Sequence, residues 1–179
     1  MTRGEAFKEI NETQDFYVEL LKDRILEESV LKEIDFSSDT GTGKTKMMCK
    51  LINRMPDYFF LVTTLSKGQL HRQIESCLHK DCINSNYKVY GVCDYTANTR
   101  LTGEEILSGI PIDKPLIWLR DEGHIHTNKW QPLLENRCFR IINISATNNY
   151  AGGDWMQFYI YNDVENRLSA SGNDWRRIN

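Results

Sequence analysis

A short glycine-containing segment, Gly41-Thr42-Gly43-Lys44-Thr45, lies between an apolar run that ends at Phe36 and a helix-compatible run that begins at Lys44. Glycines let the main chain approach a ligand closely, and the start of a helix offers unpaired amides and a positive dipole end. A polyphosphate needs this convergence of N–H donors. The order of strand, loop and helix therefore predicts a phosphate-binding loop.

The residues of this segment have separate predicted roles. Gly41, Thr42 and Gly43 would surround the phosphates. The Lys44 ammonium group would reach the β and γ phosphates, and the Thr45 hydroxyl would bind the Mg²⁺ that bridges them. Ser38 stands where the G-x-x-x-x-G-K-T pattern usually has its first glycine, which makes the start of the loop less flexible but removes no phosphate ligand. The alternative is an ordinary glycine-containing turn followed by a solvated lysine.

The rest of the chain alternates between apolar runs and helical patterns. Six runs have the length of buried strands, at residues 30–36, 58–63, 87–93, 116–119, 141–145 and 156–161. Helical patterns cover residues 12–28, after the possible cap Asn11, and then 44–55, 67–78 and 102–108. Strands that alternate with helices argue for a parallel sheet covered on both faces. We therefore expect a three-layer α/β domain with a mainly parallel central sheet.

Composition limits the class of protein. The 179 residues suit one globular domain, and neither a repeat nor a low-complexity linker divides them. No stretch has the roughly 18 apolar residues that cross a bilayer, and the first twenty residues lack the apolar core of a signal peptide, so we expect no membrane partner and a cytoplasmic location, in the host if the protein is viral. A net charge of -3 excludes a uniformly basic coat, so any nucleic-acid contact has to be focal. Five cysteines without regular spacing favour free thiols.

Two adjacent acids follow the apolar run 116–119, within Asp121-Glu122-Gly123-His124. Ligands of open α/β sheets bind at the carboxyl ends of strands. Because neighbouring side chains on a strand point in opposite directions, the two carboxylates can act differently. Asp121 would hold the metal through water, and Glu122 would orient and deprotonate the water that attacks the γ-phosphate. Alone, such a pair is commonly a solvated turn, but its position downstream of a phosphate loop favours hydrolytic chemistry.

A third polar segment, Ser145-Ala146-Thr147, follows the next apolar run. Its hydroxyls could hydrogen-bond to His124 and sense the state of the nucleotide. The alternative is an ordinary Ser/Thr turn after a strand.

The succession G-T-G-K-T, D-E-G-H and S-A-T resembles motifs I, II and III of DExH-type superfamily 2 helicases, in a style most similar to type III restriction enzyme motor subunits and phage helicases. The resemblance implies a RecA-like domain that binds ATP and Mg²⁺. It implies phosphate binding by Gly43, Lys44 and Thr45, metal binding by Thr45 and Asp121, a general base in Glu122, and coupling through His124, Ser145 and Thr147.

Two further segments resemble the same family. Gln14 is similar to the upstream glutamine that reads adenine, with a surface position on a helix as the alternative. Residues 61–73 are similar to motif Ia, which touches a nucleic-acid backbone. The resemblance implies DNA or RNA contacts by Thr63, Thr64 and Lys67, and the alternative is a solvated polar loop.

Helicases of this family close ATP between two RecA-like domains, and residues 1–179 have room for only one. The second domain supplies an arginine finger worth about 10³ to 10⁵ in rate. We therefore expect weak ATP hydrolysis by this chain alone and a partner that supplies the second motor domain. Three functions stay open: the motor domain of a helicase or translocase, a non-catalytic nucleotide- or protein-binding regulatory module of a replication or restriction complex, and a viral packaging ATPase. Gln14 and His124 argue against the last of these.

Overall fold

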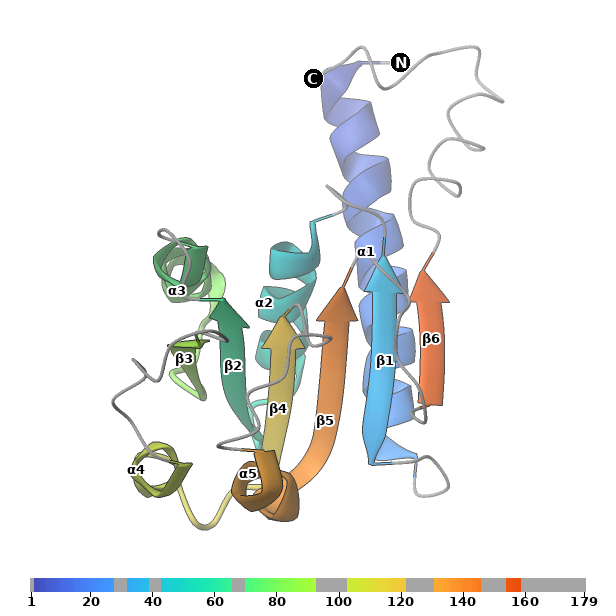
Figure 1. The fold of residues 1–179 in the computed structure, drawn as a ribbon. Helices are drawn as coiled ribbons and strands as arrows, with labels where there is room; N and C mark the ends of the chain where they lie inside the picture. Colours follow the sequence, from blue (N-terminus) through green and yellow to red (C-terminus); the bar gives the residue numbers. More distant parts are fainter. Residues whose placement is uncertain are drawn as a thin grey trace.

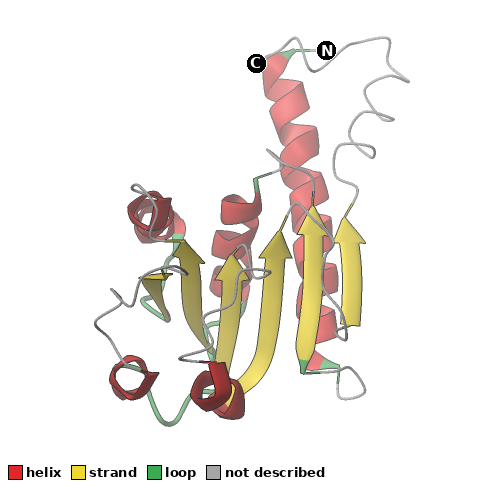
Figure 2. Cartoon of the chain, in the orientation of Figure 1, coloured by secondary structure: helices red, strands yellow, loops and turns green. Residues whose placement is uncertain are grey.

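The computed structural model describes residues 2–27, 32–38, 43–65, 70–92, 103–121, 131–145 and 154–158. Figures 1 and 2 show the helices and strands of this part of the chain. In chain order they are α1 (Arg3–Leu26), β1 (Glu33–Ser38), α2 (Lys44–Arg54), β2 (Phe59–Leu65), α3 (Leu70–Asp81), β3 (Tyr87–Val92), α4 (Gly103–Ser108), β4 (Leu116–Asp121), α5 (Gln131–Arg137), β5 (Cys138–Ser145) and β6 (Asp154–Phe158).

The six strands form one sheet in the order β3-β2-β4-β5-β1-β6. All neighbouring pairs in this order run parallel. The predicted α/β class with a parallel central sheet is therefore confirmed. Since β5 lies between β1 and β4, the strand before the glycine-containing segment and the strand that ends at Asp121 are not direct neighbours.

Helices cover both faces of the sheet, as Figure 1 shows. Along β4, Ile117 and Leu119 belong to the core that α1, α2 and α3 complete. The alternate residues Leu116 and Trp118 belong to a second core, completed by Ile106 of α4 and by α5. This alternation is the period of two that a strand buried on both faces requires.

Helix α1 begins well before the predicted position. Its cap is Thr2 and not Asn11, and Thr2 forms a reciprocal capping box with Glu5. The early part of α1 extends beyond the end of the sheet in Figure 1, so it needs no apolar stripe and gave no helical pattern in the sequence. The later part packs on the sheet through the buried residues Val18, Leu21 and Ile25.

Helix α5 was not predicted at all. It is short, and Leu134 is its only residue in the second core among those described. One buried position gives no periodicity to detect. Strand β5, which follows directly, begins at Cys138 and not at 141. Within the described segments, none of the helices combines the length and the apolar character needed to cross a membrane.

Candidate functional site

The strands that precede the predicted site segments end together at the carboxyl edge of the sheet. The parallel register pairs Asp121 at the end of β4 with Ile144 of β5. The following residue, Ser145, is paired with Ser37 of β1, four positions before the glycine-containing segment begins at Gly41. The three strands that lead to the glycine-containing, acidic and Ser-Ala-Thr segments are therefore adjacent and end at the same level.

The position of β5 sets the spacing between β1 and β4. Neighbouring strands are about 4.8 Å apart, so two intervals separate the backbones of β1 and β4 by about 10 Å. In open α/β sheets, ligands bind in the crevice outside the carboxyl ends of the strands. A polyphosphate with its hydrated cation fits between groups that far apart.

Gly43 connects the glycine-containing segment to α2. It is the N-cap of α2 in the left-handed conformation, with φ 82° and ψ 42°, and the Met47 amide donates to its carbonyl at 3.0 Å. Because glycine has no side chain, no side chain of the N-cap residue occupies the amides of the first turn. Such a helix start favours an anionic ligand.

Gln14 of α1 packs directly against Gly43. A Cβ atom added at Gly43 would collide with the Gln14 side-chain Nε2. Gln14 is only 6% exposed, so the alternative of a surface glutamine is wrong. The structure brings this residue to the predicted phosphate loop, whereas its role in reading adenine stays a prediction.

The polar side chains in the first turn of α2 lie in different surroundings. Lys44 and Thr45 are half-buried at the start of the helix. Lys46 is exposed and pairs with Asp81 of α3, with Nζ 2.7 Å from Oδ2. The next two residues, Met47 and Met48, turn into the core. Lys44 and Lys46 therefore lie two residues apart in different surroundings.

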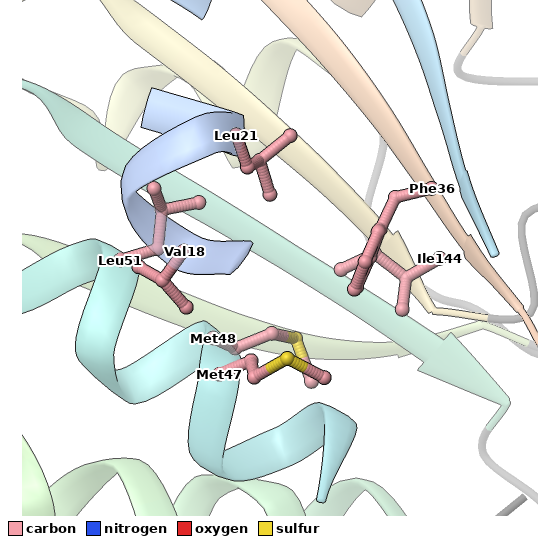
Figure 3. A pocket seen from close by; sticks show the side chains of 7 residues that line it. All are labelled: Val18, Leu21, Phe36, Met47, Met48, Leu51 and Ile144. Carbon is pink, nitrogen blue, oxygen red and sulfur yellow. The ribbon is translucent and has the colours of Figure 1, made fainter. Parts of the chain in front are cut away.

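A small apolar pocket lies under this part of the site. Figure 3 shows that its wall comes from α1, α2, β1 and β5. Phe36 and Ile144 enter it from the strands that precede the glycine-containing and Ser-Ala-Thr segments. The remaining lining residues are Val18, Leu21, Met47, Met48 and Leu51. With no polar lining side chain, this pocket is packing beneath the site and not a place for phosphate.

Thr64 of β2 holds the carboxylate of Asp121. Its Oγ1 donates to Asp121 Oδ2 at 2.8 Å. Thr64 is fully buried and Asp121 is half-buried, so the bond is shielded from water. A hydrogen bond to a charged acceptor of this kind fixes the direction of the carboxylate.

The predicted nucleic-acid contacts of Thr63 and Thr64 are wrong. Thr64 is 0% exposed and its hydroxyl is bonded to Asp121. Thr63 is 4% exposed, and its Oγ1 accepts a hydrogen bond from Trp118 Nε1 at 2.9 Å. Both hydroxyls are engaged inside the fold because both residues belong to a central strand, so neither is available to a nucleic-acid backbone.

A buried polar network joins the three site-bearing strands on the face of α4 and α5. Arg120 of β4 donates from Nε to Asn143 Oδ1 of β5 at 2.7 Å and from Nη2 to Glu33 Oε1 of β1. The Asn143 Nδ2 group donates to Asp35 Oδ1 at 2.7 Å and to Glu33 Oε1 at 2.5 Å. Asn143 and Asp35 are buried, so these bonds fix β1, β5 and β4 relative to one another.

Asp35 has an unusual environment within this network. Burial raises the pKa of its carboxyl above the ordinary value, and the neighbouring Glu33 carboxylate raises it further. The hydrogen bond from Asn143 and the charge of Arg120 act in the opposite direction without cancelling the rise.

Several predicted site residues lie outside the described segments. They are Gly41, Thr42, Lys67, Glu122, His124 and Thr147, together with the side chain of Ser145. Within the part of the chain that is described, no three His, Cys, Asp or Glu side chains cluster as metal ligands. The predicted Mg²⁺ site uses one such side chain, that of Asp121, beside a hydroxyl, phosphate and water.

The contact of Thr64 with Asp121 and the polar network were not predicted from the sequence. A signal for the network was present, because Asp35, Arg120 and Asn143 each interrupt an apolar strand. Polar residues in buried strands require partners, which they find most readily on adjacent strands. No comparable signal marked Thr64, since threonine is common in strands.

Comparisons of the chain with protein-family models, with curated proteins and with solved structures gave no significant match.

Proposed function

We propose that this chain is the ATP-binding motor domain of a DNA or RNA helicase or translocase, with a RecA-like fold. In this proposal ATP and Mg²⁺ occupy the carboxyl edge of the sheet between β1 and β4. Lys44 binds the β and γ phosphates, while Thr45 and Asp121 hold the metal.

One observation carries the proposal: the register of the sheet. It aligns the ends of β1, β5 and β4, and the three predicted motifs follow those ends. A chance occurrence of the three motifs would not be expected to fall on adjacent strands at one level. The hydrogen bond from Thr64 adds support, because it holds Asp121 in the way that a metal-binding carboxylate requires.

The start of α2 at Gly43 is also suited to the phosphates of a nucleotide. A helix start without a side-chain cap favours phosphate, and the Gln14 amide lies beside it on the α1 side. Within the proposal, Gln14 contacts the base of the same nucleotide.

In this proposal, hydrolysis depends on further groups besides those that bind the nucleotide and the metal. Glu122 would act as the base toward the attacking water. A second motor domain, supplied by a protein partner, would stabilise charge on the γ-phosphate. The proposal thus combines ATP binding with slow turnover by the chain alone.

The test is ATP turnover with and without single-stranded DNA or RNA, in the wild type and in Glu122→Gln. We expect slow turnover that nucleic acid stimulates and that Glu122→Gln abolishes while ATP still binds. Turnover that persists at the wild-type rate in Glu122→Gln would contradict the assigned base. Binding of ATP without any turnover, even with a partner chain, would favour the regulatory module.

A further inference from the structure

Polar contacts join α2 to the C-terminal end of α3. Lys46 of α2 pairs with Asp81, and Asn53 Nδ2 donates to the Asp81 carbonyl at 2.9 Å. The Asn53 Oδ1 atom accepts from the Ile83 amide, also at 2.9 Å. These contacts, from Lys46 in the first turn of α2 and Asn53 in its last turn, hold residues 81–83 against α2.

Two thiols, those of Cys49 and Cys82, lie at this contact between α2 and residues 81–83. Cys49 of α2 is 2% exposed and its Sγ lies 3.8 Å from the Cys77 carbonyl oxygen. Cys82, directly after α3, packs half-buried against the core cluster that contains Cys49. Cys49 lies one helical turn from both Lys46 and Asn53, and Cys82 lies between Asp81 and Ile83, so the contacts of Lys46 and Asn53 bring the two cysteines to the same part of the interface. Cys49, Cys82 and Cys77 are all free thiols, and Cys77 differs from the other two because it is exposed to solvent.

The two thiols are chemically unequal. The interaction between the two thiols lowers the pKa of Cys82 and raises that of Cys49, and burial raises the pKa of Cys49 further. The more exposed thiol is therefore the better nucleophile, and the buried one is held beside it.

We propose that Cys49 and Cys82 form a reversible redox pair whose oxidation joins α2 to α3 through a disulfide. Free thiols in reducing compartments can serve as such sensors when a resolving cysteine is adjacent. The inference depends on the α2–α3 interface and is independent of the proposed nucleotide site.

Hydrogen peroxide is the oxidant in this proposal. The Cys82 thiolate attacks one peroxide oxygen, the O–O bond breaks, and the hydroxide that leaves takes up a proton to give water and a Cys82 sulfenic acid. The Cys49 sulfur then attacks the sulfenic sulfur. The S–S bond forms as the S–O bond breaks, and the Cys49 proton leaves with the hydroxyl group as a second water. Two thiols are oxidised, and one peroxide is reduced to two waters.

The test is peptide mapping of the folded, reduced wild-type protein after treatment with hydrogen peroxide and alkylation of the remaining thiols. Trypsin separates the three cysteines of this region into peptides 47–50, 73–80 and 81–88. We expect the linked pair 47–50 with 81–88 as the main product, reversed by dithiothreitol and accompanied by a rise in melting temperature.

Two variants sharpen the test. Cys77→Ser should leave the link intact, because that side chain is exposed and not part of the pair. Cys49→Ser should stop the reaction at a Cys82 sulfenic acid, which dimedone traps. If Cys49→Ser does not fold, the wild-type map still decides. Links through Cys77, or oxidation of Cys82 to sulfinic acid while Cys49 stays a free thiol, would overturn the proposal.

Discussion

Thr63 and Thr64 are adjacent on β2, yet their hydroxyls serve opposite faces of the sheet. The Thr64 hydroxyl donates to the Asp121 carboxylate, and that of Thr63 accepts from the Trp118 indole. One bond points to the candidate metal ligand, and the other belongs to the second core. The pair therefore offers matched substitutions of equal size with different expected consequences.

Thr64→Val should weaken Mg²⁺-dependent nucleotide binding. Valine keeps the shape of threonine but cannot donate the hydrogen bond to Asp121, which is worth about 1 kcal/mol, or roughly fivefold in affinity. Titration of Mg²⁺ at fixed ATP, followed by calorimetry, measures this change directly.

Thr63→Val is the control for that substitution. It leaves the buried Trp118 Nε1 without its acceptor, which costs about 1–3 kcal/mol of folding stability. The midpoint for Mg²⁺ should stay at the wild-type value. An equal effect of both valines on the Mg²⁺ midpoint would show that Thr64 does not position Asp121.

Asp35→Asn should change how stability depends on pH. Because the folded-state pKa of Asp35 is raised, its favourable contribution is present below the unfolded value of 3.8 and is lost as pH rises through the folded pKa. Asparagine cannot ionise and still accepts from Asn143. Relative to the wild type, the variant should therefore gain stability as pH rises from about 4 to 7.

Urea unfolding of both proteins across this pH range tests the prediction. The groups around Asp35 are Glu33, Arg120 and Asn143, from three different strands. A stability difference that is constant with pH, or that falls as pH rises, would show that Asp35 is readily ionised in the folded protein.

At the scale of whole elements, Gly43 sets how α1 and α2 meet. Gly43→Ala places a side chain in a left-handed conformation, at a cost of about 1–2 kcal/mol, and directs it at the Gln14 amide. We expect a loss of at least about 2 kcal/mol in the free energy of unfolding, measured in urea.

The double variant Gly43→Ala with Gln14→Ala separates the two causes. It removes the collision but keeps the backbone strain, so it should be more stable than the two single effects added together. Strict additivity would mean that α1 does not contact the start of α2 through Gln14.

The strands and most helices could be predicted because each carries its own local signal. The runs at 58–63 and 87–93 lie close to β2 (Phe59–Leu65) and β3 (Tyr87–Val92). The start of α1 was missed because its exposed early residues need no apolar stripe. Helix α5 was missed because one buried leucine defines no period. Signals of this kind reflect packing, so an element that packs little gives little signal.

The candidate site could be predicted only in part. The order of the motifs along the chain was enough to expect that Asp121 and the start of α2 lie at one edge. It could not reveal that Thr64 bonds to Asp121, because that requires β2 and β4 to be neighbours with Thr63 opposite Arg120. Pairings between strands distant in sequence are set by the tertiary fold and leave no local pattern.

At the scale of the molecule, three adjacent strands are held in register from both faces. Apolar side chains such as Phe36 and Ile144 pack beneath α1 and α2, and the network around Asn143 fixes the other face. A site made of loops that follow separate strands needs such a rigid support, because small shifts between strands would move its groups apart.

The proposed nucleotide site is tested most sharply by calorimetry of Mg²⁺-ATP binding to the wild type, Lys44→Ala and Lys46→Ala. We expect the wild type to bind. Lys44→Ala should lose about 10- to 100-fold in affinity because a charge-assisted contact disappears, and Lys46→Ala should bind with near wild-type affinity because that side chain pairs with Asp81. No binding by the folded wild type, or equal binding by all three proteins, would contradict the proposed nucleotide site.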